Sequence, residues 1–164
     1  MLQKKVCVLG SFSVGKTSLI RRYVESIFSD TYLTTVGVKI DKKTLAVGNE
    51  PITLLLWDIA GEDDVTAIRM TYVRGAAGYF LVADGTRAET LEVARSIQSR
   101  VSAELGPVPF LLLLNKADLK EQWDLSQQPI ETLERAGWSI LRTSAKTGEG
   151  VEEAFETLAQ RMVS

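Results

Sequence analysis

Gly10-Ser-Phe-Ser-Val-Gly-Lys-Thr-Ser18 is the stretch of sequence that decides the fold. It directly follows the short apolar run at residues 6–9 and directly precedes a helical pattern that begins at Leu19. A loop of the form G-x-x-x-x-G-K-[ST] between a strand and a helix is typical of a phosphate-binding loop. Its glycines allow backbone N–H groups to surround an anion at the positive end of the helix. The pattern predicts that the chain binds a nucleoside polyphosphate.

The side chains of this loop have separate expected roles. Lys16 is expected to reach the β- and γ-phosphates, and the hydroxyl of Thr17 is expected to hold Mg²⁺. The loop residues expected to bind the nucleotide are Ser13, Val14, Gly15, Lys16, Thr17 and Ser18.

The composition limits the chemistry that the chain can perform. We expect its 164 residues to form one domain, 1–164, with a core of its own. There is no histidine and Cys7 is the only cysteine, which excludes Ser-His-Asp triads, intrachain disulfides and zinc sites built on cysteine. A net charge of −2 without a dense Lys/Arg run argues against nucleic-acid binding.

The sequence also predicts where the protein resides. No apolar stretch approaches the roughly 20 residues of a membrane-spanning helix. The first predicted strand begins too close to the amino terminus to leave room for a signal peptide. We therefore expect a cytoplasmic protein.

Apolar or β-prone runs alternate with helical patterns along the chain. Residues 48–51, Gly-Asn-Glu-Pro, form a turn cluster typical of an antiparallel hairpin, and the continuous apolar run 110–114 suits a central parallel strand. Thr86 is the expected N-cap of the longest helix, and Gly106-Pro107 is expected to end it. The pattern predicts an α/β three-layer sandwich with one antiparallel edge strand. The predicted strands cover residues 6–9, 38–47, 52–57, 77–83, 110–114 and 139–142, and the predicted helices cover 16–26, 65–74, 86–105, 128–136 and 151–162.

Further polar motifs follow other predicted strands, at the edge where ligands of such sheets bind. Asp58 ends the strand 52–57 and is expected to hold Mg²⁺ through water, while the N–H of Gly61 approaches the γ-phosphate. As an isolated pattern, D-x-x-G is weak, because Asp and Gly commonly end strands. Its position beside a phosphate-binding loop favours the functional interpretation.

Two later loops indicate which base is bound. Asn115-Lys-Ala-Asp118 follows the strand 110–114, and the carboxylate of Asp118 is expected to accept two N–H groups of guanine. Adenine presents an acceptor there, and a buried site of this kind discriminates strongly. The Lys116 stem is expected to lie along the base, and Asn115 to tie this loop to the phosphate loop.

After the last strand, the backbone N–H groups of the loop that starts at Thr143 are expected to bond the guanine O6, through Ser144, Ala145 and Lys146.

The segment between the first helix and the hairpin contains two more candidates. The hydroxyl of Thr35 is expected to contact Mg²⁺ when a γ-phosphate is present, and Phe28 is expected to pack against the base. A core phenylalanine and a solvated loop threonine are the alternatives.

In this order, the motifs resemble those of the Ras superfamily of small GTPases over essentially the whole chain. Residues 32–38 and 72–76 are most similar to the Rab branch. The resemblance implies a P-loop NTPase fold with a six-stranded, mostly parallel sheet and five helices. It implies a GTP-dependent switch that engages effectors, exchange factors and GTPase-activating proteins through switch I, about residues 29–39, and switch II, about 60–73. The residues expected to take part in catalysis are Lys16, Thr35 and Glu62.

Glu62 stands where the family usually has a glutamine that orients the attacking water. Glutamine both accepts and donates hydrogen bonds, whereas an ionised glutamate only accepts them. A carboxylate about 4 Å from the γ-phosphate is repelled by about 4 kcal/mol per unit charge at an effective dielectric near 20. We therefore expect slow intrinsic hydrolysis.

Phe12 occupies a phosphate-loop position that is usually small in the family, and a ring there is expected to crowd the γ-phosphate. No arginine lies between Arg22 and Arg69, so these residues supply no arginine finger in cis. Three adjacent carboxylates at residues 62–64 are most often a solvated turn, and their position also suggests a changed choice of regulators. The chain also ends without the prenylated cysteines of its relatives, which predicts membrane contact only through a missing tail or a partner.

Three functions compete at this point. The first is a slow GTPase switch with Mg²⁺, and the second is a GTP-binding recruitment module with negligible hydrolysis. The third, an ATPase or nucleotide kinase, is disfavoured because Asp118 and the loop 144–146 select guanine, and because the chain has no lid-sized insertion.

Overall fold

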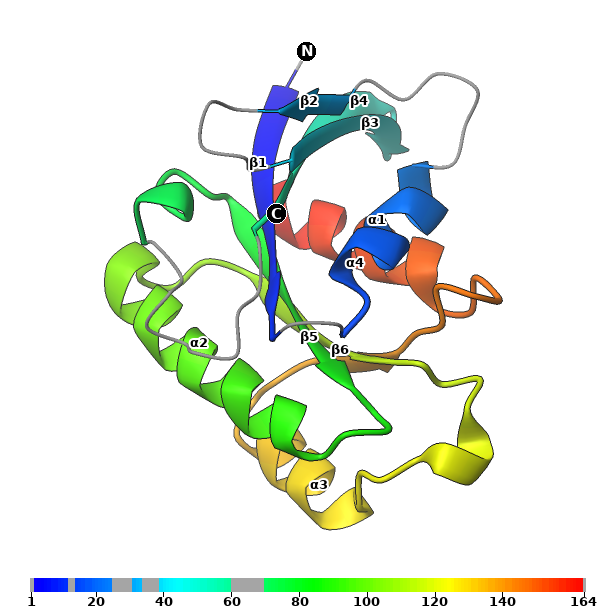
Figure 1. Cartoon of the computed structure of the whole chain (residues 1–164). Helices are drawn as coiled ribbons and strands as arrows, with labels where there is room; N and C mark the ends of the chain where they lie inside the picture. Colours follow the sequence, from blue (N-terminus) through cyan, green and yellow to red (C-terminus); the bar gives the residue numbers. More distant parts are fainter. Residues whose placement is uncertain (1, 12–13, 25–30, 34–38, 60–69, 164) are drawn as a thin grey trace.

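The computed structural model describes residues 2–11, 14–24, 31–33, 39–59 and 70–163 (Figure 1). A single sheet runs through the molecule, and helices cover both of its faces. The strands are β1 (Leu2–Gly10), β2 (Thr31–Leu33), β3 (Lys39–Val47), β4 (Glu50–Asp58), β5 (Gly78–Asp84), β6 (Phe110–Asn115) and β7 (Ile140–Arg142). The helices are α1 (Lys16–Val24), α2 (Glu89–Leu105), α3 (Gln127–Arg135) and α4 (Val151–Val163), with short 3-10 turns η2 (Met70–Tyr72) and η3 (Lys120–Gln122).

The strands are ordered β2-β3-β4-β1-β5-β6-β7. The five strands from β4 to β7 are parallel, whereas β3 is antiparallel to β4 and β2 is antiparallel to β3. The predicted hairpin is present, with Gly48 at a φ of 63° in its turn. Because β1, β5 and β6 are parallel neighbours, their carboxyl ends and the loops that follow meet at one edge of the sheet.

The predicted α/β three-layer class is confirmed. All six predicted strands are present, and the three-residue strand β2 adds a seventh at the edge, next to β3. Four of the five predicted helices lie in the described part of the chain; the fifth, at residues 65–74, falls mostly outside it, and only η2 is described there. None of the described helices is both long and apolar enough to span a bilayer.

Strand β5 explains how the sheet supports two cores. Its seven residues are all buried, and successive side chains point to opposite faces. Phe80 and Val82 face α1 and α4, whereas Tyr79, Leu81 and Ala83 face α2 and α3. A continuous apolar run is therefore what this central strand requires.

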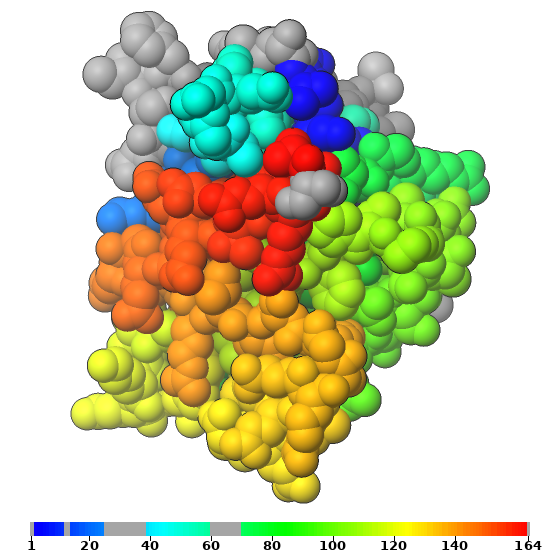
Figure 2. Space-filling model, turned by 180° about the vertical axis from the view of Figure 1, so that it is seen from behind, coloured from blue at the N-terminus to red at the C-terminus, as the bar shows by residue number. Residues whose placement is uncertain are grey.

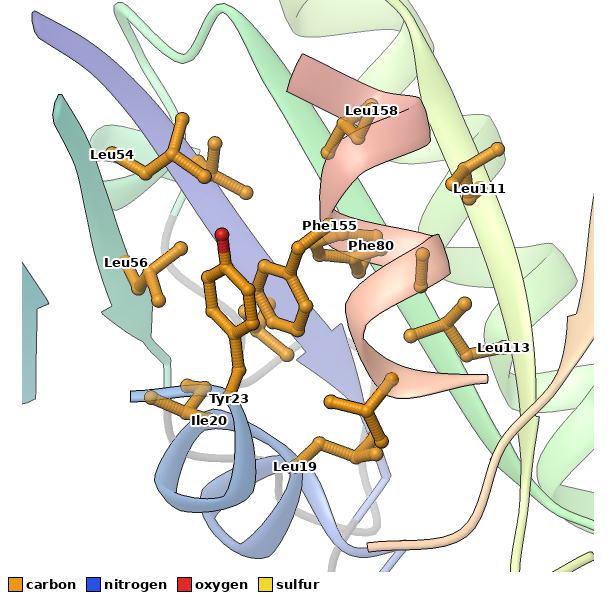
Figure 3. Packing of buried hydrophobic residues seen from close by; sticks show 14 of the residues in the cluster. Leu19, Ile20, Tyr23, Leu54, Leu56, Phe80, Leu111, Leu113, Phe155 and Leu158 are labelled. Carbon is orange, nitrogen blue, oxygen red and sulfur yellow. The ribbon is translucent and has the colours of Figure 1, made fainter. Parts of the chain in front are cut away.

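The core beneath α1 and α4 is built around aromatic rings (Figure 3). Tyr23 of α1 and Phe155 of α4 stack with ring centroids 3.8 Å apart, and Phe80 lies 4.7 Å from Phe155 in a tilted arrangement. Figure 2 shows α4, in red, lying across this side of the molecule below the β3–β4 hairpin. This packing anchors α1, which follows the phosphate loop directly.

The expected N-cap of α2 is wrong. The helix begins at Glu89, and the hydroxyl of Thr86 donates instead to Oδ1 of Asp84 at 2.6 Å. The Asp84 carboxylate accepts from both the N–H and the hydroxyl of Thr86, so this residue belongs to the turn after β5 that precedes the helix. The expected end is confirmed, because Gly106 has a φ of 72° and its N–H donates to the carbonyl of Ser102.

Candidate nucleotide-binding site

The described part of the phosphate loop has a backbone that only glycine suits at position 15. Gly15 has a φ of 102°, and a Cβ there would lie 2.2 Å from Nδ2 of Asn115. Helix α1 begins at the next residue, and its first intrahelical bond runs from the N–H of Leu19 to the carbonyl of Gly15. The N–H groups of the first turn therefore face the loop, as at anion sites on helix termini.

Lys16 is buried at the centre of this loop, with an exposed fraction of 7%. Its Nζ donates to the carbonyl oxygens of Ser11 at 3.0 Å and Gly10 at 3.3 Å. Burial lowers the pKa of Lys16, and the Asp58 carboxylate offsets part of that effect. Among the described residues, the buried hydroxyl of Ser11 has no hydrogen-bond partner. A buried ammonium and an unpaired hydroxyl both fit an anion such as a phosphate.

Thr17 and Asp58 bring two oxygen atoms together beside Lys16. The hydroxyl of Thr17 donates to Oδ2 of Asp58 at 2.5 Å, and joins the start of α1 to the end of β4. A hydroxyl and a carboxylate are hard oxygen ligands of the type that Mg²⁺ prefers. The donor set therefore fits the expected ion.

Asn115 connects the phosphate loop to the loop that follows β6. Its Nδ2 donates to the carbonyl of Val14 at 2.9 Å, and its Oδ1 accepts a 3.2 Å hydrogen bond from the hydroxyl of Thr143. All of these groups are buried. The predicted tie between the two loops is thus present in the structure.

Asp118 and Ser144 meet beside a cavity that also borders the phosphate loop. The hydroxyl of Ser144 donates to Oδ1 of Asp118 at 2.7 Å, and the N–H of Thr147 donates to the Ser144 hydroxyl at 3.1 Å. These bonds hold the carboxylate in one orientation. The cavity has a volume of about 380 Å³ and is lined by Gly15, Ser18, Asn115, Lys116, Asp118, Leu119, Ala145 and Lys146.

The expected base contacts of the last loop are narrowed by the structure. The N–H of Thr143 donates to the carbonyl of Leu114, and that of Ser144 donates to the carbonyl of Glu149. Both N–H groups are therefore used within the protein. Of the N–H groups expected to contact the guanine O6, those of Ala145 and Lys146 are then the remaining candidates.

Sequence reasoning missed Asp84, which contacts a predicted base-binding residue. Its Oδ2 lies 2.7 Å from Nζ of Lys116. Asp84 ends β5 and is paired with Asn115, the last residue of β6. The only signal available in the sequence was an aspartate directly after the predicted strand at residues 77–83.

Several predicted site residues lie outside the described part of the chain. The structure therefore gives no geometry for Ser13, Phe28, Thr35, Gly61 and Glu62. The same holds for Phe12.

The sheet order and the strand–loop–helix unit at residues 2–24 define a Ras-like P-loop fold. Residues 5–164 match the Ras family, and the chain belongs to this family of small GTPases. It is 36% identical to Rab-7L1 of Rattus norvegicus, over 98% of this chain and 82% of that protein. It is 36% identical to Rab-13 of Canis lupus familiaris, over 95% and 78%, and 35% identical to Rab-21 of Mus musculus, over 97% and 72%. The expected similarity to the Rab branch is confirmed.

Proposed function

We propose that residues 1–164 form one domain that binds GDP and GTP with Mg²⁺ and hydrolyses GTP slowly. One observation carries this proposal: the hydrogen bond from Asn115 Nδ2 to the Val14 carbonyl joins the phosphate loop to the loop of Asp118 around a single cavity. Its volume of about 380 Å³ lies in the range typical of small-molecule sites. A ligand with a phosphate chain at one end and a base at the other matches this arrangement.

The phosphate end of the ligand is assigned to the loop before α1. Lys16 and the N–H groups of the first turn of α1 stabilise the phosphate oxygens, because the charges are opposite and the donors are held in place by the helix. Thr17 and Asp58 would hold Mg²⁺, and the family pattern adds Thr35. When bound, the ion neutralises negative charge on the phosphates.

The base end is assigned to the carboxylate of Asp118. Ionised, it accepts hydrogen bonds only, so it suits the two adjacent N–H groups of guanine. Because the Ser144 hydroxyl already donates to Oδ1, the carboxylate is oriented before the ligand arrives. An adenine would place an acceptor nitrogen against it and leave a buried charge poorly paired.

Hydrolysis is expected to proceed by attack of a water oxygen on the γ-phosphorus. The bond from that phosphorus to the β–γ bridging oxygen breaks, GDP leaves, and the water protons end on phosphate and solvent. Glu62 has no N–H to donate to a γ-phosphate oxygen, and Phe12 adds bulk to the phosphate loop. Both features favour slow turnover.

The GTP form is proposed to engage effectors through switch I and switch II. The same two regions are proposed to contact the exchange factors and GTPase-activating proteins that change the bound nucleotide. The acidic run at residues 62–64 favours regulators other than those of typical Rab proteins. The alternative function is a recruitment module that binds GTP without appreciable hydrolysis. It has the same support from Glu62 and Phe12.

Two measurements test the proposal. Exchange of radiolabelled GDP, GTP and ATP with Mg²⁺ present is expected to yield tight binding of the guanine nucleotides only. Single-turnover release of phosphate from bound GTP is expected to be slow but above a buffer blank. A preference for ATP contradicts the assignment of the base, and phosphate release equal to the blank favours the recruitment module.

A further inference from the structure

Asp84 is a buried carboxylate at the end of β5, with an exposed side-chain fraction of 1%. Its Oδ1 accepts from the N–H and the hydroxyl of Thr86 at 2.8 and 2.6 Å. Its Oδ2 accepts from Nζ of Lys116 at 2.7 Å and Nε of Arg87 at 3.2 Å. Burial alone would raise the pKa of Asp84, but these hydrogen bonds, with that of Lys116 the largest, outweigh burial and lower it. The group is therefore a negative charge with both oxygens used.

Lys116, the partner of Asp84, has an unusual backbone. Its φ of 68° makes it the one non-glycine residue with a positive φ in the described part of the chain. Such a conformation costs free energy and persists where the surrounding structure imposes it. Lys116 follows the buried Asn115, lines the cavity together with Asp118, and is about one-third exposed. The residue that pairs with Asp84 thus has a constrained backbone and forms part of the cavity wall.

The loop that carries Asp84 is itself held by the segment that follows the cavity-lining residue Leu119. The N–H of Asp124 donates to the carbonyl of Gly85 at 2.7 Å, and Oδ2 of Asp124 accepts from the N–H of Ala88 at 2.9 Å. The ring of Trp123 lies so close to Gly85 that a Cβ at this position would be 1.9 Å from it. Asp84 is therefore a rigid support and not one of several mobile surface charges.

We propose that Asp84 is a positioning residue for the guanine nucleotide: it holds the side chain of Lys116 along the cavity wall and so slows release of the ligand. This inference rests on the proposed function. Asp84 lines no part of the cavity and acts through Lys116. Its effect is confined to the base side of the site, so it is the same for GDP and GTP. Removal of Mg²⁺ is therefore expected to accelerate release by the same factor in an Asp84 variant as in the wild type.

The test compares release of radiolabelled GDP from the 164-residue chain and its variants. Asp84→Asn keeps the shape of the side chain and removes its charge. It is expected to accelerate release by about tenfold, because it removes the charge-assisted hydrogen bond that holds the ammonium group of Lys116. Asp124→Asn is the matched control: the same change in the adjoining segment, where the amide oxygen still accepts from Ala88. Its release rate is expected to equal that of the wild type.

A double-mutant cycle separates positioning from a general structural effect. Lys116→Met keeps an apolar stem and removes the ammonium group. If Asp84 acts through Lys116, Asp84→Asn adds little to the release rate once Lys116→Met is present. If Asp84→Asn does not fold, Asp84→Glu, which moves the charge by one methylene, takes its place and is expected to accelerate release to a smaller extent.

The outcomes discriminate between this inference and the proposed function. Release at the wild-type rate from the Asp84 variant, or a full additional acceleration in the Lys116→Met background, overturns the inference while the proposed function stands. Accelerated release that disappears in that background supports it. A wild-type chain without affinity for GDP contradicts the proposed function itself.

Discussion

Nδ2 of Asn115 donates a 2.9 Å hydrogen bond to the carbonyl of Val14, 101 residues away in sequence, and this bond joins the two halves of the candidate nucleotide-binding site. Asn115→Ala removes the bond and leaves buried acceptors at Val14 and a buried hydroxyl at Thr143 without a partner. We expect a loss of about 1–3 kcal/mol in the free energy of unfolding and faster release of GDP. Denaturant titration and a GDP-release assay measure the two effects. Thr143→Val, which leaves the bond to Val14 intact, is expected to have the smaller effect on release; equal effects would show that the tie does not hold the site.

The contact between Gly85 and Trp123 predicts a second, purely structural effect. A methyl group at position 85 would overlap the indole ring, so Gly85→Ala forces the segment around Trp123 to move. We expect a loss of about 1–3 kcal/mol in the free energy of unfolding, as for other overpacked sites. In a Trp123→Ala background the same substitution is expected to cost much less. A cost that is unchanged by removal of the ring would mean that another contact limits position 85.

Much of this fold follows from short-range patterns. The apolar run at residues 110–114 is the inner parallel strand β6, as a strand covered on both faces requires. Gly106 ends α2 as expected. The strand β2 has only three residues and exists through its pairing with β3, so its sequence carries no periodic signal. Strand pairing of this kind depends on the tertiary structure and cannot be predicted from the local β-propensity of the sequence.

Candidate residues that belong to a sequence motif could be identified from the sequence. Contacts that depend on which strands are neighbours in the sheet could not. The hydrogen bond of Asn115 to Val14 joins two residues that the sequence motifs had already identified. The same is true of the hydrogen bond of Ser144 to Asp118. Asp84 was missed because its role depends on strand register, which pairs it with Asn115. The same carboxylate accepts from the hydroxyl of Thr86, which lies in the turn before α2, and the helix begins three residues later, at Glu89. The structure shows these contacts within the protein, and the nucleotide-binding and catalytic roles of all the predicted site residues, Thr35 and Glu62 included, stay predictions.

Cys7 is expected to resist alkylation in the folded protein. Its side chain is completely buried in β1, and burial raises the pKa of its thiol to about 12, although Lys5 acts in the opposite direction. The thiolate is the reactive form, so both access and ionisation oppose the reaction. Iodoacetamide at pH 8 is expected to leave the native chain unmodified and to label the chain fully in denaturant, as measured by mass spectrometry. Rapid labelling under native conditions would show that β1 opens readily.

Glu62→Gln tests the proposed cause of slow hydrolysis. Glutamine accepts a hydrogen bond from the attacking water and donates one to a γ-phosphate oxygen, whereas the ionised glutamate repels that oxygen. We expect single-turnover phosphate release to rise by about tenfold or more, since a positioned side chain of this kind contributes at least that much. GDP release is expected to stay at the wild-type rate, because the change affects a group assigned to the γ-phosphate.

Phe12 provides the matched comparison for Glu62. If crowding of the phosphate loop is a second, independent cause, Phe12→Gly accelerates hydrolysis by itself, and the double variant exceeds either single one. If Glu62→Gln leaves phosphate release unchanged while Phe12→Gly raises it, bulk at position 12 and not charge at position 62 limits turnover. If even the double variant hydrolyses no GTP above a buffer blank, the recruitment module becomes the better description, because removing both the charge at position 62 and the bulk at position 12 would then leave the chemistry absent.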